Sequence, residues 1–415
     1  MKSWVPHSTD SDFSIHHLPF GIFKTATRNV RVGVAIGEHI LDMKLLAREG
    51  FLKDWDYPQN VFSQPFLNGL MALGRTASAA LRRELQSLLS SENPALRDSA
   101  LRDELLVPMK SAELLLPVNV RDYTDFYSSI EHATNVGTMF RGPENALMPN
   151  WKHLPVGYHG RASSIIVSGT DIHRPKGQKT PAEGASQPGF GPTNLLDIEL
   201  EMAFITCKPN ALGASISTEA AEDHIWGMVL FNDWSARDIQ KWEYVPLGPF
   251  LGKSFASSIS AWVTPMEALE PFRCAGPEQD PEVLPYLTYS GQKNYDIDLE
   301  VWLETPSGVK QKIAHSNFKY MYWNMVQQLA HHTVNGCNIN VGDMYGSGTI
   351  SGPTPDSYGS LLELTWRGSK PIQLTDGTER KFLQDGDTIV LKGYCKTPAV
   401  RLGFGEVRTT ILPAI

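Results

Sequence analysis

An acidic segment with alternating apolar residues is the first place in the chain where chemistry could be concentrated. Residues 196–204 read LDIELEMAF, so Asp197, Glu199 and Glu201 share one face of a predicted strand and the apolar residues share the other. Glu199 and Glu201 would then lie roughly 6.5–7 Å apart along the strand. Two carboxylates at this separation repel each other unless a cation lies between them, and hard divalent ions prefer such oxygen ligands. The segment is therefore a candidate metal site.

A second segment shows the same pattern, so alternation alone does not identify a metal site. Residues 296–304 read DIDLEVWLE, with acids at alternate positions and no obvious chemistry in the neighbouring sequence. An acidic ladder of this kind is typical of the solvated face of an antiparallel sheet. The first segment differs because residues 231–244 and 248–255, which follow it, are dense in acids, cations and aromatic residues. We therefore place the candidate site around Glu199 and Glu201.

Further segments rich in polar and aromatic residues lie upstream and downstream: residues 122–129, 132–137, 150–160 and 346–352. Spacing alone assigns them no role, because a single histidine such as His132 is more often structural than catalytic. In the same way, tyrosines and tryptophans more often belong to a core or an interface than to a substrate pocket.

The order of these motifs resembles the fumarylacetoacetate hydrolase family. The motifs are DYTDFY at 122–127, LPVGYHGR at 154–161, DIELE at 197–201, NDWSARDIQ at 232–240, PLGPFLGKSF at 246–255 and SGTISG at 347–352. The resemblance covers nearly the whole chain, including the first 117 residues, which smaller members of the superfamily lack. It implies hydrolysis of a carbon–carbon bond of 4-fumarylacetoacetate, a small diketo acid, to fumarate and acetoacetate, the last step of phenylalanine and tyrosine catabolism.

The resemblance implies a catalytic role for five residues. His132 would take a proton from water, and Glu363, in the motif LLEL, would orient it. Arg237, Gln240 and Lys253 would face the negative charge that develops on the departing enolate. These residue types suit the reaction, because an imidazole titrates near neutral pH and a hydrogen bond to a carboxylate fixes its tautomer.

The resemblance also implies a metal site and a substrate pocket. The ligands of a calcium or magnesium ion would be four carboxylates: Asp125, Glu199, Glu201 and Asp233. The pocket would be lined by Tyr127, Arg141, Tyr158, Gln240, Tyr244 and Thr349. A second cation in this family lies beside Asp233 and the loop of Lys253, where the sequence departs because Ala256-Ser257 replaces Gly-Thr. Ser257 keeps a hydroxyl, so Lys253 and Ser257 stay candidates for this second site.

Two other functions stay open. The first is a related enzyme of the same superfamily, an acylpyruvase or a metal-dependent decarboxylase or isomerase of 2-oxo acids, which would reuse the carboxylates and the metal. A decarboxylase or isomerase would not need both His132 and Glu363. The second is a non-catalytic scaffold rich in β-strands, in which both acidic strands are solvated faces.

The elements that must position these residues are expected to be mostly strands, in a mainly β (α+β) fold. Residues 31–43 predict a hairpin around Gly37-Glu38, and apolar residues spaced by three or four between 70 and 88 predict an amphipathic helix. Further helices are expected from 217 towards 226 and over 318–334, and an irregular loop over 174–192. We expect a small SH3-like β-barrel domain at 1–117, and a catalytic, metal-binding domain with the family's rolled mixed β-sandwich at 118–415.

Composition narrows the function classes. The chain has 415 residues, 37 Lys+Arg and 45 Asp+Glu, for a net charge of −8, which argues against a nucleic-acid binder. Its four cysteines are far apart, so neither a disulfide framework nor a thiolate zinc site is indicated. No apolar run has the length of a signal peptide or a membrane span, so we expect a cytoplasmic protein without a membrane partner. The resemblance implies a homodimer.

Overall fold

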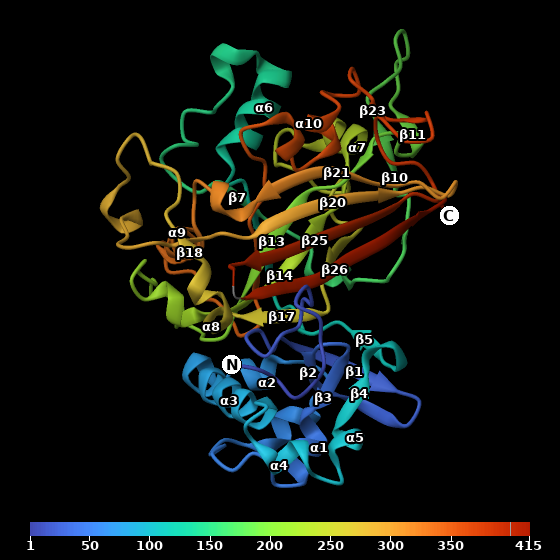
Figure 1. Cartoon of the computed structure of the whole chain (residues 1–415). Coiled ribbons are helices and arrows are strands. Elements are labelled where there is room, and N and C mark those ends of the chain that lie inside the picture. Colours follow the sequence, from blue (N-terminus) through green and yellow to red (C-terminus); the bar gives the residue numbers. More distant parts are fainter. Residues whose placement is uncertain (399) are drawn as a thin grey trace.

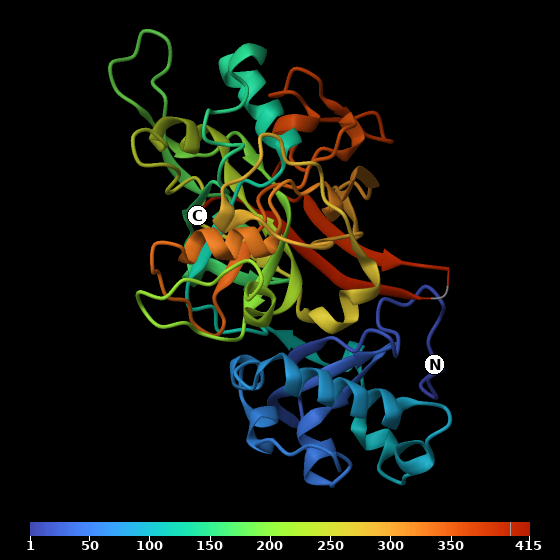
Figure 2. The ribbon, with the colours of Figure 1, turned by 90° about the vertical axis from the view of Figure 1, so that its left-hand side faces the viewer.

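The computed structural model describes residues 1–398 and 400–415, and its N-terminal part lies to one side of a larger strand-rich part (Figures 1 and 2). The strands of the N-terminal part are β1 (Phe20–Thr25), β2 (Arg28–Ile36), β3 (His39–Asp42), β4 (Leu106–Pro108) and β5 (Glu113–Leu115). Its helices are α1 (Met43–Arg48), α2 (Asn68–Met71), α3 (Gly74–Leu89), α4 (Pro94–Arg97) and α5 (Arg102–Leu105).

The predicted hairpin and the predicted amphipathic helix are both present in the N-terminal part. Strands β2 and β3 pair antiparallel around Gly37, whose φ of +57° suits a glycine. Helix α3 buries Leu81, Leu85 and Leu88 on one face, as the spacing of apolar residues indicated.

The expected mainly β fold with a separate N-terminal domain is confirmed, but the strands of residues 1–117 do not close into a barrel. The N-terminal strands follow the order β4-β3-β2-β1, and β1 pairs along its other edge with β5 and with β17 (Trp262–Pro265) of the larger part. Because β17 takes part of the edge of β1, with Phe20 opposite Val263, the small sheet continues into the large one instead of curling back on itself. The boundary near residue 117 stays a prediction.

The larger part is built mainly from two sheets. Besides β17, the strands that join the N-terminal ones are β6 (Tyr123–Phe126), β7 (Gly157–His159), β8 (Ile165–Val167), β13 (Leu200–Thr206), β14 (Ile225–Asp233), β16 (Ser257–Ile259) and β22 (Met344–Gly346). The second sheet has the order β21-β20-β25-β26-β9, from β21 (Lys310–Asn317), β20 (Asp298–Glu304), β25 (Thr388–Lys396), β26 (Arg401–Leu412) and β9 (Ile172–His173).

Four short strand pairs and five α-helices complete the larger part, as far as its residues are described. The pairs are β10 (Lys176–Lys179) with β11 (Gly189–Pro192), β12 (Leu196–Asp197) with β15 (Ser235–Ala236), β18 (Arg273–Cys274) with β19 (Asn294–Tyr295), and β23 (Ile372–Gln373) with β24 (Glu379–Arg380). The helices are α6 (Ile130–Arg141), α7 (Arg237–Glu243), α8 (Met266–Leu269), α9 (Met325–Thr333) and α10 (Leu361–Leu364).

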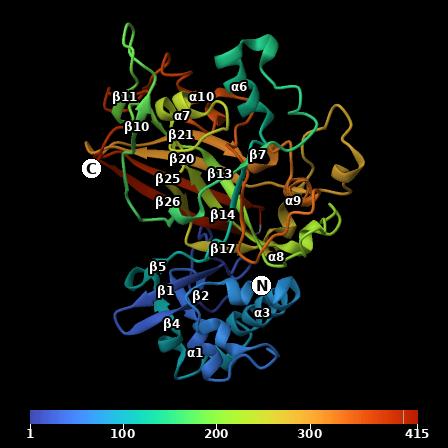
Figure 3. The same ribbon diagram turned by 180° about the vertical axis from the view of Figure 1, so that it is seen from behind.

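Strands β13 and β14 are buried on both faces, which makes them the rigid centre of the molecule. One face packs against the second sheet, where Met228 and Leu230 meet Leu299 and Leu391 in one apolar core. The opposite face belongs to another apolar core that also contains the N-terminal part. Figure 3 shows these strands from behind, with β17 next to the N-terminal part. Side chains at the ends of β13 and β14 are therefore held in place by packing on both faces of these strands.

Two of the expected helices and the expected loop differ from the structure. Residues 221–224 form only a 3-10 turn, and Trp226 already belongs to β14, because its fully buried side chain is needed in the core. The helix over 318–334 is shorter: α9 starts after Asn324, whose side chain accepts from the backbone N of Gln327 and caps it. The loop over 174–192 contains the β10–β11 hairpin.

Candidate active site

The two acidic segments that looked alike in the sequence have opposite environments. In β20 the acids lie on a partly exposed face, where Glu300 binds Lys312 and Glu304 binds Lys310 and Arg408. Every residue of 196–206 is buried. The strand is also interrupted between β12 and β13, and Glu199 lies at this interruption. The acids of the second ladder are therefore neutralised at the surface, whereas Glu199 and Glu201 lie inside the protein.

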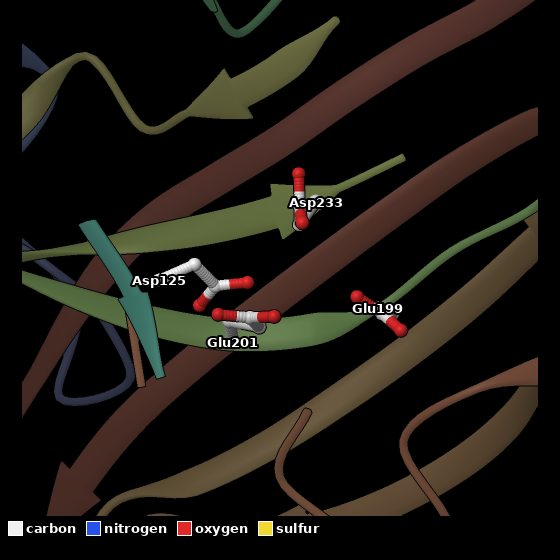
Figure 4. A group of neighbouring side chains, drawn as sticks. All are labelled: Asp125, Glu199, Glu201 and Asp233. Carbon is white, nitrogen blue, oxygen red and sulfur yellow. The ribbon is translucent and has the colours of Figure 1, made fainter. Parts of the chain in front are cut away.

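Four carboxylates converge at the end of these central strands (Figure 4). One oxygen from each of Asp125, Glu199, Glu201 and Asp233 lies within 4.8 Å of the others, and all four residues are buried. Asp125 comes from β6, Asp233 ends β14, and the two glutamates come from β13 and the residue before it. These are the four residues that the resemblance implied as metal ligands.

At two of the four carboxylates, burial and repulsion outweigh the attraction of the nearby Lys253. Burial, followed by repulsion from neighbouring carboxylates, raises the pKa of Asp125 and of Glu201 well above the ordinary values. Asp125 Oδ1 and Glu201 Oε1 are also buried, and neither has a hydrogen-bond partner in residues 1–398 or 400–415. Oxygen donors of this number and burial suit a hard divalent cation, so the residues present fit the metal that the family implies.

The pKa of Glu199 shifts in the opposite direction, because two cationic side chains flank its carboxylate. Arg237 Nη1 lies 2.9 Å from Glu199 Oε1, and Lys253 Nζ binds Glu199 Oε2. Burial by itself would raise the pKa of Glu199, but Lys253, Arg237 and His132 outweigh it and lower the pKa to about 2. Glu199 is therefore ionised throughout the neutral pH range.

The residues expected around a second cation also meet at Asp233. Lys253 Nζ lies 2.6 Å from Asp233 Oδ2, and Ser257 Oγ donates to Asp233 Oδ1 at 2.9 Å. Tyr158 OH donates to Asp233 Oδ2 at 2.9 Å. Asp233 thus accepts hydrogen bonds from several donors, and the hydroxyl of Ser257 is one of them.

His132 and Glu363 form a buried pair. His132 Nδ1 lies 2.6 Å from Glu363 Oε2, and Glu363 also accepts from Asn135, Ser351 and Ser360 at 2.8–3.0 Å. Burial would raise the pKa of Glu363, but the charge of His132 and these hydrogen bonds outweigh it and lower the pKa. A carboxylate fixed in this way orients the ring of His132, so its other nitrogen is free to act on a proton.

One cavity of about 610 Å³ joins these groups. The residues of the expected site that line it are Asp125, Tyr127, His132, Arg141, Tyr158, Glu199, Glu201, Arg237, Gln240, Tyr244, Lys253 and Thr349. Glu363, Asp233 and Ser257 do not line it. Glu363 and Asp233 contact the lining residues His132 and Lys253, and Ser257 contacts Asp233. Its volume and mixed polar and aromatic wall suit a small organic acid.

Sequence reasoning missed several residues of this site. Lys241 lines the cavity. It lies on α7 four residues after Arg237 and three before Tyr244, which caps the end of the helix, and this spacing was a signal that one helix face was involved. Asn135 had the same kind of signal, three residues after His132 on α6. Asp197 lay within the quoted motif but received no role, because nothing in the sequence showed what it contacts.

Comparison with known proteins gives matches over the whole chain. The family model for the fumarylacetoacetate hydrolase C-terminal region matches residues 122–412, and that for the fumarylacetoacetase N-terminal region matches 16–117. Fumarylacetoacetases from Dictyostelium discoideum and Homo sapiens are each 54% identical to this chain, over 100% of it and 98% and 99% of their own lengths. The enzyme of that name from Arabidopsis thaliana is 52% identical, over 100% of this chain and 99% of its own.

Among solved structures, the fumarylacetoacetate hydrolase from the psychrophilic Exiguobacterium antarcticum has a similar fold. The TM-score is 0.50 at 17% identity, over 95% of this chain and 99% of that one. No helix in residues 1–398 or 400–415 has the length and apolar character needed to cross a membrane.

Proposed function

Because the chain belongs to the fumarylacetoacetate hydrolase family, we propose that it is a hydrolase that cleaves 4-fumarylacetoacetate to fumarate and acetoacetate. The observation that carries this proposal is the placement of the His132–Glu363 pair and the carboxylate cluster on one cavity. Relatives that share half of their residues with this chain along its full length carry the name of this activity.

The residues can be assigned to the steps of the reaction. His132 takes a proton from a water molecule, and the hydroxyl oxygen adds to the carbonyl carbon next to the double bond. The bond from that carbon to the methylene group breaks, and its electron pair leaves as the enolate of acetoacetate. The proton held by His132 then returns to the methylene carbon. Glu363 stabilises the charged form of His132 between these two transfers.

The cations of the cavity oppose the negative charge on the departing fragment. Burial would lower the pKa of Arg237 and of Lys253, but the neighbouring carboxylates raise both pKa values, so both side chains stay charged. Arg237 Nη2 is buried and has no partner among the described residues, which leaves one donor available to an oxygen of the substrate. Gln240 accepts from Arg237 Nη1 at 3.4 Å and so turns its amide nitrogen away from that guanidinium.

We propose calcium or magnesium as the metal, held by Asp125, Glu199, Glu201 and Asp233. When bound, such a cation supplies Lewis-acid stabilisation of negative charge on substrate oxygens. Calorimetric titration separates the two metals, because calcium accepts the six to eight oxygens of a flexible site whereas magnesium requires a near-octahedral one. A comparison of metal titrations of the wild type and of the Ser257→Ala variant tests whether a second cation binds.

The test of the proposed function is direct. The purified protein is incubated with 4-fumarylacetoacetate, and fumarate and acetoacetate are separated by chromatography and quantified. Equal amounts of both products are expected, with loss of turnover after exhaustive chelation and recovery on addition of calcium or magnesium. Absence of both products, or full activity after chelation, would contradict the proposal.

A decarboxylase or isomerase of 2-oxo acids is the competing activity. It would release carbon dioxide or change the position of a double bond without consuming water, and it would not need His132 and Glu363 together. The 2.6 Å contact between these two residues favours hydrolysis. An assay with oxaloacetate in place of the diketo acid distinguishes the activities. Oxaloacetate has a carboxylate that a decarboxylase can remove, but it has no β-diketone for a hydrolase to cleave.

We further propose that the protein is a homodimer and is located in the cytoplasm. Support for the homodimer comes from the segment 242–251, where large apolar side chains are exposed: Trp242, Tyr244, Val245, Leu247, Phe250 and Leu251. Light scattering on the wild type and on Leu247→Glu/Phe250→Glu tests it, with a dimer expected only for the wild type. Location is tested by cell fractionation.

A further inference from the structure

The fully buried Asp197 joins the two sides of the site without lining the cavity. It is the last residue of β12, and its carboxylate accepts four hydrogen bonds. Oδ2 accepts from Arg237 Nε at 2.9 Å and from Leu362 N at 3.0 Å, and Oδ1 accepts from Leu361 N at 2.7 Å and from Ile198 N at 2.8 Å. One side chain therefore holds an arginine and the start of a helix at the same time.

Both groups that Asp197 holds continue directly into the catalytic machinery. Leu361 and Leu362 begin α10, and the next residue is Glu363, which binds His132 at 2.6 Å. On the other side, Arg237 reaches Glu199 at 2.9 Å through Nη1. The register supports this arrangement, since Asp197 pairs with Ser235 across β12 and β15, two residues before Arg237.

We infer that Asp197 is a positioning residue, which fixes the distance between the general base and the cation that faces the leaving group. The inference rests on the proposed hydrolysis. Arg237 lies on α7 and Glu363, which orients the general base His132, lies on α10, more than a hundred residues away in the chain. Asp197 is a direct hydrogen-bonded link between Arg237 and the start of α10. Because catalysis depends on sub-ångström placement of such groups, loss of this link lowers kcat more than it changes KM.

The chain contains a matched control. Asp42 is also fully buried, accepts from Leu45 N at 3.0 Å at the start of α1, and binds Arg28 and Arg31 at 2.6 and 3.1 Å. Like Asp197, Asp42 accepts from the backbone at the start of a helix and forms ion pairs with arginine. However, Asp42 lies in the N-terminal part and does not line the cavity. Asp42→Asn therefore measures what this combination contributes to stability alone.

The experiment compares Asp197→Asn with Asp42→Asn in the metal-loaded protein. Asparagine keeps one accepting oxygen but presents an NH₂ group where Arg237 Nε and Leu362 N need an acceptor. Both variants are expected to lose stability, whereas kcat falls on the order of 10²-fold, with KM within about threefold, only for Asp197→Asn. A folded Asp197→Asn protein with kcat within about twofold of wild type overturns the inference.

A second readout needs no turnover. The proton between His132 Nδ1 and Glu363 should give a far-downfield ¹H resonance, which is expected to shift or vanish in Asp197→Asn and to stay in place in Asp42→Asn. An unchanged resonance in both variants overturns the inference, whereas absence of turnover in the wild type contradicts only the proposed function. Asp197→Ser, which is smaller and leaves a hydroxyl for the helix start, is the second variant if the asparagine protein does not fold.

Discussion

At the residue scale, the carboxylates of Glu199, Asp125 and Glu201 in one cluster are in two different electrostatic states. Glu199 lies between Arg237 and Lys253, which hold its pKa low, whereas Asp125 and Glu201 have raised pKa values and unpaired oxygens. With all four carboxylates ionised, the cluster would therefore carry more negative charge than its own cations neutralise. A divalent ion supplies the missing positive charge, which gives a physical reason for metal binding that does not depend on resemblance to other proteins.

This imbalance predicts that metal binding releases protons. Because the pKa values of Asp125 and Glu201 are raised in the metal-free protein, the cluster retains protons that a metal must displace. Affinity is therefore expected to decrease as the pH is lowered. Calorimetry in two buffers of different ionisation enthalpy measures the protons released, and Asp125→Asn should release fewer. Identical heats in both buffers would show that the cluster is already ionised.

His132 is predicted to matter for turnover and not for the metal. His132→Ala is expected to lower kcat by about 10²–10⁴-fold, the usual contribution of a general base. Its affinity for calcium or magnesium should change little, since His132 is outside the carboxylate cluster. The matched control is His224→Ala, because His224 is also buried but does not line the cavity. Wild-type kcat in His132→Ala would rule out the proposed base.

At the element scale, the close packing of β22 against β6 and β13 brings the ligands together. Gly346 pairs with Asp125 on one side and with Ala203 on the other. A Cβ at this position would lie 2.6 Å from Asp125 Oδ1 and 3.1 Å from Glu201 Oε2. A side chain at this position would press on both carboxylates, so the glycine of this strand is part of the proposed cation site.

Gly346→Ala is therefore predicted to weaken metal binding. The added methyl group must displace the carboxylate of Asp125, and loss of ligand orientation commonly costs 10–100-fold in affinity. A decrease of at least about 10-fold is expected by calorimetry. Gly189→Ala in β11 is the control, because a Cβ there meets nothing within 4 Å. Equal affinities for the two variants would mean that the site adjusts freely.

At the scale of the whole molecule, the N-terminal part is attached through a shared sheet and a buried histidine. His17 is fully buried, with Nδ1 2.9 Å from Asp12 O and Nε2 2.9 Å from Thr264 Oγ1 on β17. Burial lowers the pKa of His17 to about 3. Protonation of this ring is therefore unfavourable in the folded protein but not in the unfolded chain.

The sign of the resulting pH dependence follows from linkage. With an unfolded pKa near 6.5 and a folded pKa near 3, the unfolded state binds more protons between these values. Stability is therefore complete above pH 6.5 and decreases below it, by up to about 1.4 kcal/mol per pH unit. Urea unfolding at pH 7 and pH 5 should show a smaller loss for His17→Gln than for the wild type. His173→Gln, at an exposed position, should behave as wild type; equal losses in all three would exclude His17 as the cause.

Local pattern was enough to predict the features that depend on neighbours in the chain. The β2–β3 hairpin and helix α3 follow from turn residues and apolar spacing, and the ordered motifs placed Asp125, Glu199, Glu201 and Asp233 in one site. Trp226 marks the limit of this reasoning: its surroundings read as a helix, but the demand for a large buried side chain placed it in β14.

The sequence by itself determined which residue types the site contains and the family to which they correspond. The tertiary structure decided that one acidic ladder is buried and the other solvated, because 196–204 and 296–304 have the same alternation and their burial depends on what packs against them. It alone decided that the N-terminal sheet stays open, since β17 pairs with β1 across more than two hundred residues. The role of Asp197 depends likewise on contacts between distant segments, and distant contacts leave no periodic signal in a sequence.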